Sequence, residues 1–511
     1  MTNNQSDLPK IDRWHSEPLD VHKWSDHPEI KSLSDHLYAE VGINILDKSG
    51  NRKGKKSAHQ MLQVLLVDLY VRWLHDPTMA TGFSKNKNSY HVGSRYNKVF
   101  ISPKIIQVVK VLEDEGYIDS LPGYNDRTGK GDNYTTRIRP SEKLRGEFRQ
   151  ISATLYDIDY HVGRELIILR ERYEDETEQV HKRNIEYTDT DHTNRIREQL
   201  EAYNELLRRT FIDIPSLEEP FVRRIIETGK RAGQEIKISI GPENKHVHRV
   251  FNGTEDDNWT KGGRFYGGWW LQIPKELRKD IYINDQPTVE IDFKAMHPNM
   301  LMETSAADPY RLDRLVLPDL IPNAQQQRDV VKSLILMAIN ANNANGAFAA
   351  FRNAHKRGDP LKKLTNEQLQ ILLDAFTDQH PEMREALNTG KALHLMNLDS
   401  QIANLVIDHF TQRGFPVLCI HDSFIIQDDK QQELRKALDH ASQQIIRKGI
   451  VQDTKSNGSE VPTFIQGNIK EYQTGQKAKI KIPNRVKPTE QYKLRKMKYY
   501  KWLEQREGSK I

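Results

Sequence analysis

The chain has 511 residues, enough for about two to four domains with a sizeable core. Its 76 Lys and Arg against 71 Asp and Glu leave a net charge of +5, so a nucleic-acid surface would need local clustering of positive charge. The single cysteine, Cys419, excludes an intramolecular disulfide and a cysteine-based zinc site, and no apolar stretch reaches the ~18 residues that a membrane helix needs. We therefore expect a cytoplasmic protein that does not enter a membrane.

Residues 57–145 carry the pattern of a small domain that mixes helices and strands. Leucines at helical spacing predict a helix over 58–74, and a second helix begins at Ser102, where a capping residue precedes Pro. Two short strand patterns follow at 117–119 and 135–139, joined by a loop with turn-forming pairs. This order predicts two helices followed by a β-hairpin.

The same order resembles that of a winged helix-turn-helix domain, and the segment 112–118 is similar to the end of a recognition helix in that family. The resemblance implies DNA binding, with phosphate-facing side chains at Lys104, Lys110, Arg127 and Lys130. The alternative is a small packing module, because winged helices also serve protein contacts.

Charged segments flank this domain. Residues 1–56 are polar and end in a basic run, which is typical of an N-terminal arm. Residues 146–210 combine many Glu and Arg with few leucines, which predicts a solvated helical connector. We assign no chemistry to either segment.

Two apolar strand patterns between residues 211 and 475 each deliver an aspartate. The run 289–293 contains Asp292 near its end, and the run 416–426 is interrupted by Asp422. Because a charge in a buried strand is costly unless it is paired or binds a metal, two such aspartates suggest one site for hard divalent cations such as Mg²⁺. Two ions held in this way can stabilise both the attacking and the leaving oxygen in phosphoryl transfer. The alternative is that Asp292 caps a turn and that Asp422 sits in a hairpin.

Four motifs stand in one order in this region. Residues 260–264 read Thr-Lys-Gly-Gly-Arg, Asp292 follows on its strand, residues 328–332 read Arg-Asp-Val-Val-Lys, and residues 421–424 read His-Asp-Ser-Phe. They resemble the T/D-x-x-G-R motif and motifs A, B and C of the single-subunit, phage- and mitochondrial-type RNA polymerases, which are kin of the bacterial DNA polymerase I (family A) enzymes. The resemblance covers about residues 250–430. It implies an α+β right-hand polymerase, with a palm sheet and helical fingers and thumb.

The resemblance also implies roles for single residues. Asp292 and Asp422 would be the catalytic metal ligands, holding two Mg²⁺ ions, or Mn²⁺ in their place. Arg328 and Lys332 lie four residues apart on one helix face and would bind the phosphates of the incoming nucleotide, while Lys332 would also donate a proton to the departing pyrophosphate. The apolar neighbours of Lys332 predict a mostly buried helix in which this lysine needs a partner. Further positions would contact the primer and template (Gly263, Arg264 and His421) or the nucleotide (His297 and Asn340).

Four positions depart from the pattern of the family. Five residues after the motif A aspartate, DNA polymerases carry Glu and RNA polymerases Gly, but His297 stands here. Asn340 and Ala341 replace a Tyr-Gly pair that packs under the new base pair, and Ile402 replaces a histidine in the segment 398–403, which resembles the helix before motif C. The choice of sugar is therefore open. The short spacing between motifs predicts trimmed fingers and thumb and short products, as from a primase.

The segment 476–511 is basic and aromatic. From Lys477 onward it holds twelve Lys or Arg residues. Such a tail can track a nucleic-acid backbone and stack on bases. The alternative is an amphipathic helix packed back on the body of the protein. The aromatic residues interleaved with the basic ones are Tyr492, Tyr499, Tyr500 and Trp502.

These features together predict a template-directed nucleotidyltransferase, either a DNA-dependent RNA polymerase or a primase, that serves a mobile element or plasmid. Its partners would be a DNA template, nucleoside triphosphates and an RNA or DNA product. Two alternatives stay open. One is a family-A-like DNA polymerase on the same palm, and the other is a winged-helix DNA-binding replication initiator or regulator whose polymerase domain is inactive.

Overall fold

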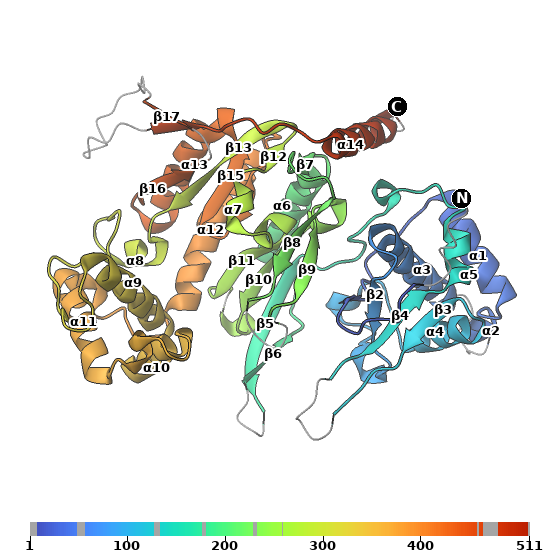
Figure 1. The fold of residues 1–511 in the computed structure, drawn as a ribbon, viewed down its shortest axis with the longest axis horizontal. Helices are drawn as coiled ribbons and strands as arrows, with labels where there is room; N and C mark the ends of the chain where they lie inside the picture. The colour runs from blue at the N-terminus through green and yellow to red at the C-terminus, as the bar shows by residue number, and fades with distance from the viewer. Residues whose placement is uncertain are drawn as a thin grey trace. The chain divides into compact units, whose positions relative to one another are not determined.

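The computed structural model describes residues 8–48, 57–126, 133–175, 180–227, 232–257, 259–456, 459–462 and 479–508. The chain divides into two compact units, both drawn in Figure 1: unit 1 comprises residues 1–165 with 241–243, and unit 2 comprises residues 166–240 with 244–511. Helices are mixed with several small sheets, as expected of an α+β chain. Within the described ranges, no helix combines the length and the apolar character that crossing a membrane requires.

Unit 1 combines a four-stranded sheet with helices around a core that includes Leu62, Val108 and Ile138. The strand order is β1-β2-β4-β3, and β4 pairs antiparallel with both β2 and β3. The two helices and two strands predicted for this region are present, and Pro103 directly precedes α4 as expected. The bounds in chain order are β1 (Ser16–Pro18), α1 (Pro28–Glu40), α2 (Ile45–Lys48), α3 (Ser57–His75), β2 (Ala80–Phe83), α4 (Lys104–Asp114), β3 (Ile118–Leu121), β4 (Thr136–Pro140) and α5 (Glu142–Phe148).

Two larger sheets organise unit 2. One has the strand order β11-β10-β5-β6 and the other the order β14-β15-β13-β12-β7. Strand β13 is central to the second sheet, because β15 pairs with one side of it while β12 and β16 pair with the beginning and the end of its other side. The strand bounds are β5 (Ile167–Glu174), β6 (Val180–Asn184), β7 (Ile212–Asp213), β8 (Phe221–Ile225), β9 (Glu235–Ser239), β10 (Val247–Asn252), β11 (Gly262–Gly267), β12 (Tyr282–Ile283), β13 (Gln286–Phe293), β14 (Leu418–Ile420), β15 (Ser423–Gln427), β16 (Gln452–Lys455), β17 (Ser459–Pro462) and β18 (Lys479–Ile482).

The helices of unit 2 belong to two hydrophobic cores. One core joins both sheets, with Phe265 from β11, Ile291 from β13 and Ile402 from α12, and it encloses Trp269 and Trp270 completely. Helices α9, α10 and α11 build the second core, and they gather at the left of Figure 1. The helix bounds are α6 (Asp191–Arg208), α7 (Lys275–Arg278), α8 (Met296–Leu301), α9 (Ala324–Asn340), α10 (Ala344–Ala354), α11 (Asn366–Gln379), α12 (Ala392–Thr411), α13 (Gln431–Ile446) and α14 (Glu490–Gly508).

The expected helical connector over residues 146–210 is wrong in its middle part. Strands β5 and β6 lie there, β5 pairs parallel with β10, and only α6 fits the expectation of a long helix. Charged side chains conceal the strand pattern in the sequence, since Glu171 and Arg183 stand opposite each other and form an ion pair of 2.9 Å across β5 and β6. Cross-strand pairs of opposite charge stabilise a sheet, so a high density of charge does not by itself indicate a helix.

The C-terminal segment forms α14, and the alternative of a helix packed on the body holds for its tyrosines. Tyr492 and Tyr499 are almost fully buried, and both rings contact Phe211 at centroid distances of 5.5 and 5.4 Å. Tyr492 also donates a hydrogen bond of 2.7 Å from its hydroxyl to Asp285. These two rings are therefore part of the core packing and are not available to stack on bases.

Candidate active site

Strand β13 and the β14–β15 hairpin bring Asp292 and Asp422 together. Asp292 stands opposite Ser423 in the β13–β15 ladder, and the backbone N–H of Phe293 donates to the carbonyl oxygen of Asp422 at 3.2 Å. The hairpin turn consists of two residues only, and His421 adopts a left-handed conformation (φ 58°) there. Because this tight turn follows a buried strand, it holds Asp422 beside the end of β13. The sequence prediction of one site for both aspartates agrees with this placement.

Burial raises the pKa of both carboxyl groups. For Asp292 burial is the largest cause, and the negative charge of Asp422 raises the pKa further while a hydrogen bond from Lys455 lowers it. For Asp422 burial again dominates, Asp399 adds to the effect, and Arg264 opposes it. A positive ion between two such carboxylates would offset the energetic cost of burying their charges and would reduce their repulsion.

A lysine and a glutamate complete the surroundings of Asp292. Lys455 lies opposite Glu290 at the end of β16, and its ammonium contacts Asp292 at 2.7 Å and Glu290 at 3.6 Å. The hydroxyl of Ser423 donates to Glu290 Oε1, the same oxygen that faces Lys455, at 2.7 Å. Three carboxylates therefore lie close to the turn, and sequence reasoning had named only two of them.

A buried ion network stands next to the aspartates. Asp399, on α12, is fully buried and accepts hydrogen bonds from Arg264, whose Nε lies 3.1 and 3.0 Å from the two carboxylate oxygens. His297 Nε2 lies 2.9 Å from Asp399 and 3.2 Å from the guanidinium of Arg264. The arginine and the histidine, both expected to contact substrate, thus face a shared carboxylate inside the protein.

The glycines before Arg264 let β11 approach α12. Gly263 has φ 89°, and a Cβ there would stand 2.7 Å from the ring of Phe251 and 2.9 Å from Ser400 Oγ. Arg249 links the same two elements, because it donates to the carbonyl oxygen of Gly263 at 2.7 Å and to Ser400 Oγ at 3.1 Å. The glycine therefore serves the close packing that delivers Arg264 to Asp399.

His421 lies on the other side of Asp422. Its ring stands edge-on to the half-exposed ring of Tyr266, with centroids 5.7 Å apart. Burial lowers the pKa of His421, and the positive charge of Arg264 lowers it further. This shift favours the neutral form of the side chain, which suits a residue that orients a partner.

Helix α9 carries the predicted phosphate-binding pair in an arrangement that differs from the expectation. Lys332 is exposed, so the prediction of a buried lysine that needs a partner is wrong. The apolar neighbours form the inner face of the helix, whereas Lys332 lies on its outer face. Arg328 is held by Asp308 at 2.9 Å and by Asp329 at 2.7 Å. Of this pair, Lys332 is thus exposed, whereas the side chain of Arg328 is 23% exposed.

Tyr310 connects these cations with the aspartates. The charged groups of Arg328 and Lys332 lie 5.9 and 6.0 Å from the centre of its ring. Burial raises the pKa of the Tyr310 hydroxyl, and the negative charge of Asp422 also contributes to the rise. The ring of Tyr310 therefore packs beside the two cations of α9, and its hydroxyl is within electrostatic range of Asp422.

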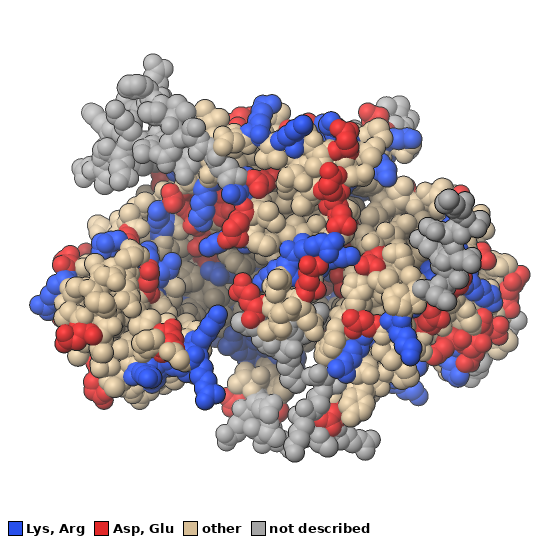
Figure 2. All heavy atoms as spheres, viewed as in Figure 1, with Lys and Arg blue, Asp and Glu red and all other residues tan. Residues whose placement is uncertain are grey.

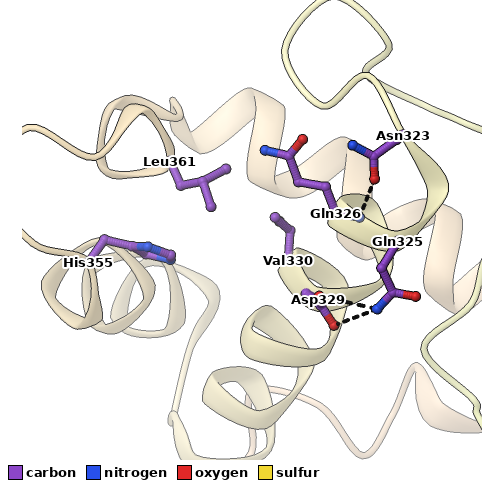
Figure 3. A pocket seen from close by; sticks show the side chains of 7 residues that line it. All are labelled: Asn323, Gln325, Gln326, Asp329, Val330, His355 and Leu361. Atoms are coloured by element: carbon purple, nitrogen blue, oxygen red, sulfur yellow. Dashed lines mark hydrogen bonds between the residues drawn. The ribbon is translucent and has the colours of Figure 1, made fainter.

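Asn340 lies at the far end of α9. It is the last residue of the helix, about 12 Å along the axis from Lys332, and its side-chain amide donates to the carbonyl oxygen of Leu336 at 2.6 Å. The opposite end of α9 borders a cavity of about 370 Å³ (Figure 3). The cavity is lined by Asn323, Gln325 and Asp329 and by side chains from the segment that follows α10. Neither Asp292 nor Asp422 lines it.

The predicted phosphate-facing side chains of unit 1 are engaged within that unit. Lys104 forms an ion pair with Asp47 at 2.9 Å, and Lys110 pairs with Asp114 at 2.8 Å on the same helix. Arg127 and Lys130 lie outside the described residues. Positive and negative side chains are interspersed over the face shown in Figure 2, in keeping with the small net charge.

Four residues near the site escaped the sequence prediction, namely Glu290, Tyr310, Asp399 and Lys455. Glu290 had a signal, because it precedes Asp292 by two residues on one strand and so faces the same side. Asp399 lies in the segment that resembles the helix before motif C, but nothing local indicated its partner. Tyr310 lies in a loop and Lys455 on the short strand β16. The local sequence of neither segment indicated a functional residue.

The donor atoms at the turn fit a magnesium site. Carboxylate oxygens are the ligands that Mg²⁺ prefers, and it binds through one or two of them while it keeps several waters. Among the described residues, no group of three or more His, Cys, Asp or Glu side chains is arranged to hold a metal ion. The candidate metal ligands are thus the pair Asp292 and Asp422.

The chain was compared with known proteins. No family model matches its sequence, and no curated protein matches it. Among solved structures it is similar to the POL domain of Pol1 from M. smegmatis in complex with DNA primer-template and dNTP, with 11% sequence identity and a TM-score of 0.26. The match covers 38% of this chain and 45% of that chain.

Proposed function

We propose that unit 2 is a template-directed nucleotidyltransferase that joins nucleotides at the turn formed by β13, β14 and β15. One observation carries the proposal: two adjacent strands deliver Asp292 and Asp422 to one point, where the charge of one raises the pKa of the other. Phosphoryl transfer asks the protein for aligned cations and carboxylates, with little covalent chemistry of its own. The cationic face of α9 and the aspartate turn supply both.

Asp292 and Asp422 would hold Mg²⁺. When bound, the metal neutralises charge on the phosphates and lowers the pKa of the attacking hydroxyl. Lys332, exposed on α9, would bind the triphosphate and protonate the leaving pyrophosphate. Arg328 is held by Asp308 and would present a fixed positive charge beside it. The network of Arg264, Asp399 and His297 would hold β11, α8 and α12 together beside the two aspartates.

The proposed substrates are ribonucleoside triphosphates, and the proposed enzyme is a DNA-dependent RNA polymerase or primase. The Thr-Lys-Gly-Gly-Arg and His-Asp-Ser-Phe motifs support the choice, since both resemble the RNA branch. The rival is a DNA polymerase on the same site. His297 contacts Asp399 and its side chain is mostly buried. Its position therefore does not indicate whether a ribose or a deoxyribose is preferred.

The experiment is nucleotide incorporation on a single-stranded DNA template, with and without a primer and with either ribo- or deoxyribonucleotides. Labelled products that require Mg²⁺ or Mn²⁺ and vanish in Asp422→Asn are expected with the ribonucleotide set. Extension with deoxyribonucleotides alone would replace the RNA polymerase by the DNA polymerase. No product under any condition would favour a DNA-binding protein without catalysis.

We further propose that unit 1 is a winged-helix-like domain that binds nucleic acid. The strand order β2-β4-β3 and the position of α4 directly before the β3–β4 hairpin support this assignment. The ion pairs of Lys104 and Lys110 leave open which surface of unit 1 makes the contact.

A further inference from the structure

We propose that unit 1 binds single-stranded nucleic acid on a cluster of aromatic and arginine side chains on the loop side of the β3–β4 ladder. This rests on the proposed nucleic-acid role of unit 1 and assigns it a surface and a ligand class. The cluster, called the hairpin patch below, consists of Arg13, Trp14, Tyr124, Tyr134 and Arg137.

The rings of the hairpin patch lie outside the core of unit 1. Among the described residues, none of Trp14, Tyr124 and Tyr134 belongs to that core or packs against it, although several other aromatic residues of the unit do. Tyr124 is 54% exposed. Trp14 and Tyr134 are partly exposed beside it. An aromatic ring exposed next to two partly exposed ones loses part of the benefit of burial, so the group points to a ligand that covers it.

Two guanidinium groups lie over these rings. Arg13 stands 4.8 Å from the ring centre of Trp14 and 5.4 Å from that of Tyr134, and Arg137 stands 5.7 Å from the latter. The combination offers flat surfaces next to positive charge.

Backbone contacts fix the hairpin patch in place. Tyr124 and Tyr134 exchange two backbone hydrogen bonds of 2.9 and 3.0 Å, and their rings lie 6.3 Å apart. Arg137 Nε donates to the carbonyl oxygen of Arg13 at 2.9 Å, which ties the N-terminal segment to β4. Gly123 allows the close approach, since a Cβ there would lie 2.7 Å from the backbone nitrogen of Thr136. Ordered side chains lose little entropy on binding.

The chemistry of the hairpin patch fits a single strand better than a duplex. Unpaired bases present their faces for stacking on aromatic rings, whereas the faces of paired bases are hidden in the helix. Guanidinium groups bind phosphates and also stack on bases. By contrast, α4 ends in Glu113, Asp114 and Glu115, and its Lys110 is paired with Asp114.

The test is fluorescence anisotropy of a labelled 12-nucleotide oligothymidine with the full-length protein, in EDTA and without nucleotides. Tyr124→Ala should weaken binding at least about fivefold, Tyr124→Phe should keep the wild-type affinity, and Arg13→Gln should lower the slope of log Kd against log salt by about 0.7. Lys110→Ala is the control and should change the affinity less than about twofold. Thermal unfolding of each variant shows that it is folded.

The outcomes separate this inference from the broader proposal. If wild-type protein binds duplex of equal length more tightly and Lys110→Ala weakens that binding, unit 1 binds nucleic acid through α4 and the hairpin patch is the wrong surface. If it binds neither DNA form, the nucleic-acid role of unit 1 fails as well. Preferential binding of a labelled proline-rich peptide, lost in Tyr124→Ala, would make the hairpin patch a protein-docking surface.

Discussion

Two aspartates of the same sheet differ in their partner and in their exposure to solvent. Asp213, on the edge strand β7, is clasped by Arg495 from α14 through two bonds of 2.8 and 3.0 Å, and the two side chains are 5% and 15% exposed. Asp292, on the central strand β13, meets Lys455 through one contact of 2.7 Å, and these side chains are 24% and 52% exposed. Burial raises the pKa of both aspartates.

The two aspartates therefore differ in the basic residue that each contacts, Arg495 for Asp213 and Lys455 for Asp292, more than in the strand on which each lies. A planar guanidinium that covers both oxygens and is itself hidden seals a carboxylate into the structure. A lysine is a point charge on a flexible stem, and a half-exposed one can leave without disturbing the sheet. Asp213 is thus a structural anchor for the C-terminal helix, while Asp292 stays accessible to a ligand.

The sharpest way to break this comparison is to neutralise each aspartate. Asp292→Asn should lower nucleotide incorporation about a thousandfold, because the amide removes a charge on which the metal and the transition state depend. Asp213→Asn should keep the wild-type rate per folded molecule. Incorporation assays on both purified variants measure the effect, and comparable losses in both would show that the two aspartates do not differ in role.

Removing the arginine tests the sealed pair. Arg495→Met leaves Asp213 buried and unpaired, which should lower the free energy of unfolding of unit 2 by about 3–5 kcal/mol at pH 8. Loss of the cation raises the pKa of Asp213 beyond its already raised value. A raised pKa in the folded state costs stability when the group is ionised, and the cost disappears as the pH falls toward the ordinary value of 3.8.

Urea unfolding at pH 8 and pH 5 measures this deficit. It should be smaller at pH 5, where part of Asp213 is protonated in the variant. An equal deficit at both pH values would show that the lost energy is packing and not charge.

Removing the lysine tests the accessible pair. Lys455→Met takes away an ammonium that competes for Asp292 and Glu290, so Mn²⁺ should bind about five to ten times more tightly. Electron paramagnetic resonance of free Mn²⁺ measures this without any catalysis. Lys294→Met is the matched control, because Lys294 directly follows β13 and pairs with Asp453 of β16 at 3.1 Å. Weaker Mn²⁺ binding in Lys455→Met would instead make Lys455 a residue that positions the carboxylates.

The smallest expected effect concerns the second anchor of α14. Tyr492→Phe removes the hydroxyl that donates to Asp285 while it keeps the buried ring, so unit 2 should lose about 1 kcal/mol of stability. Urea unfolding at neutral pH measures the loss. A variant as stable as wild type would leave Arg495 as the main clasp of the helix.

Local patterns predicted the strands of the site well, and contacts between distant segments escaped them. Runs of apolar, β-type residues placed Asp292 near the end of β13. Asp422 lies in the turn between β14 and β15, so the hairpin position given as an alternative for this residue is the one observed. Lys332 was misread because its sequence neighbours are apolar, although the helical period turns them inward and the lysine outward. The strands of the expected connector were concealed by charges that pair across β5 and β6. The sequence around Arg264 did not indicate that this arginine forms an ion pair with Asp399.

The network around Asp399 also bears on how the protein folds. Its three contacts join residues separated by 135, 102 and 33 positions along the chain. Closing long loops costs entropy before the contact rewards it, and topologies rich in such contacts fold slowly. Helices such as α9 can form from local interactions, whereas this network is complete only when β11, α8 and α12 have all docked. A fragment that ends before α12 therefore lacks the carboxylate of Asp399 that Arg264 and His297 contact.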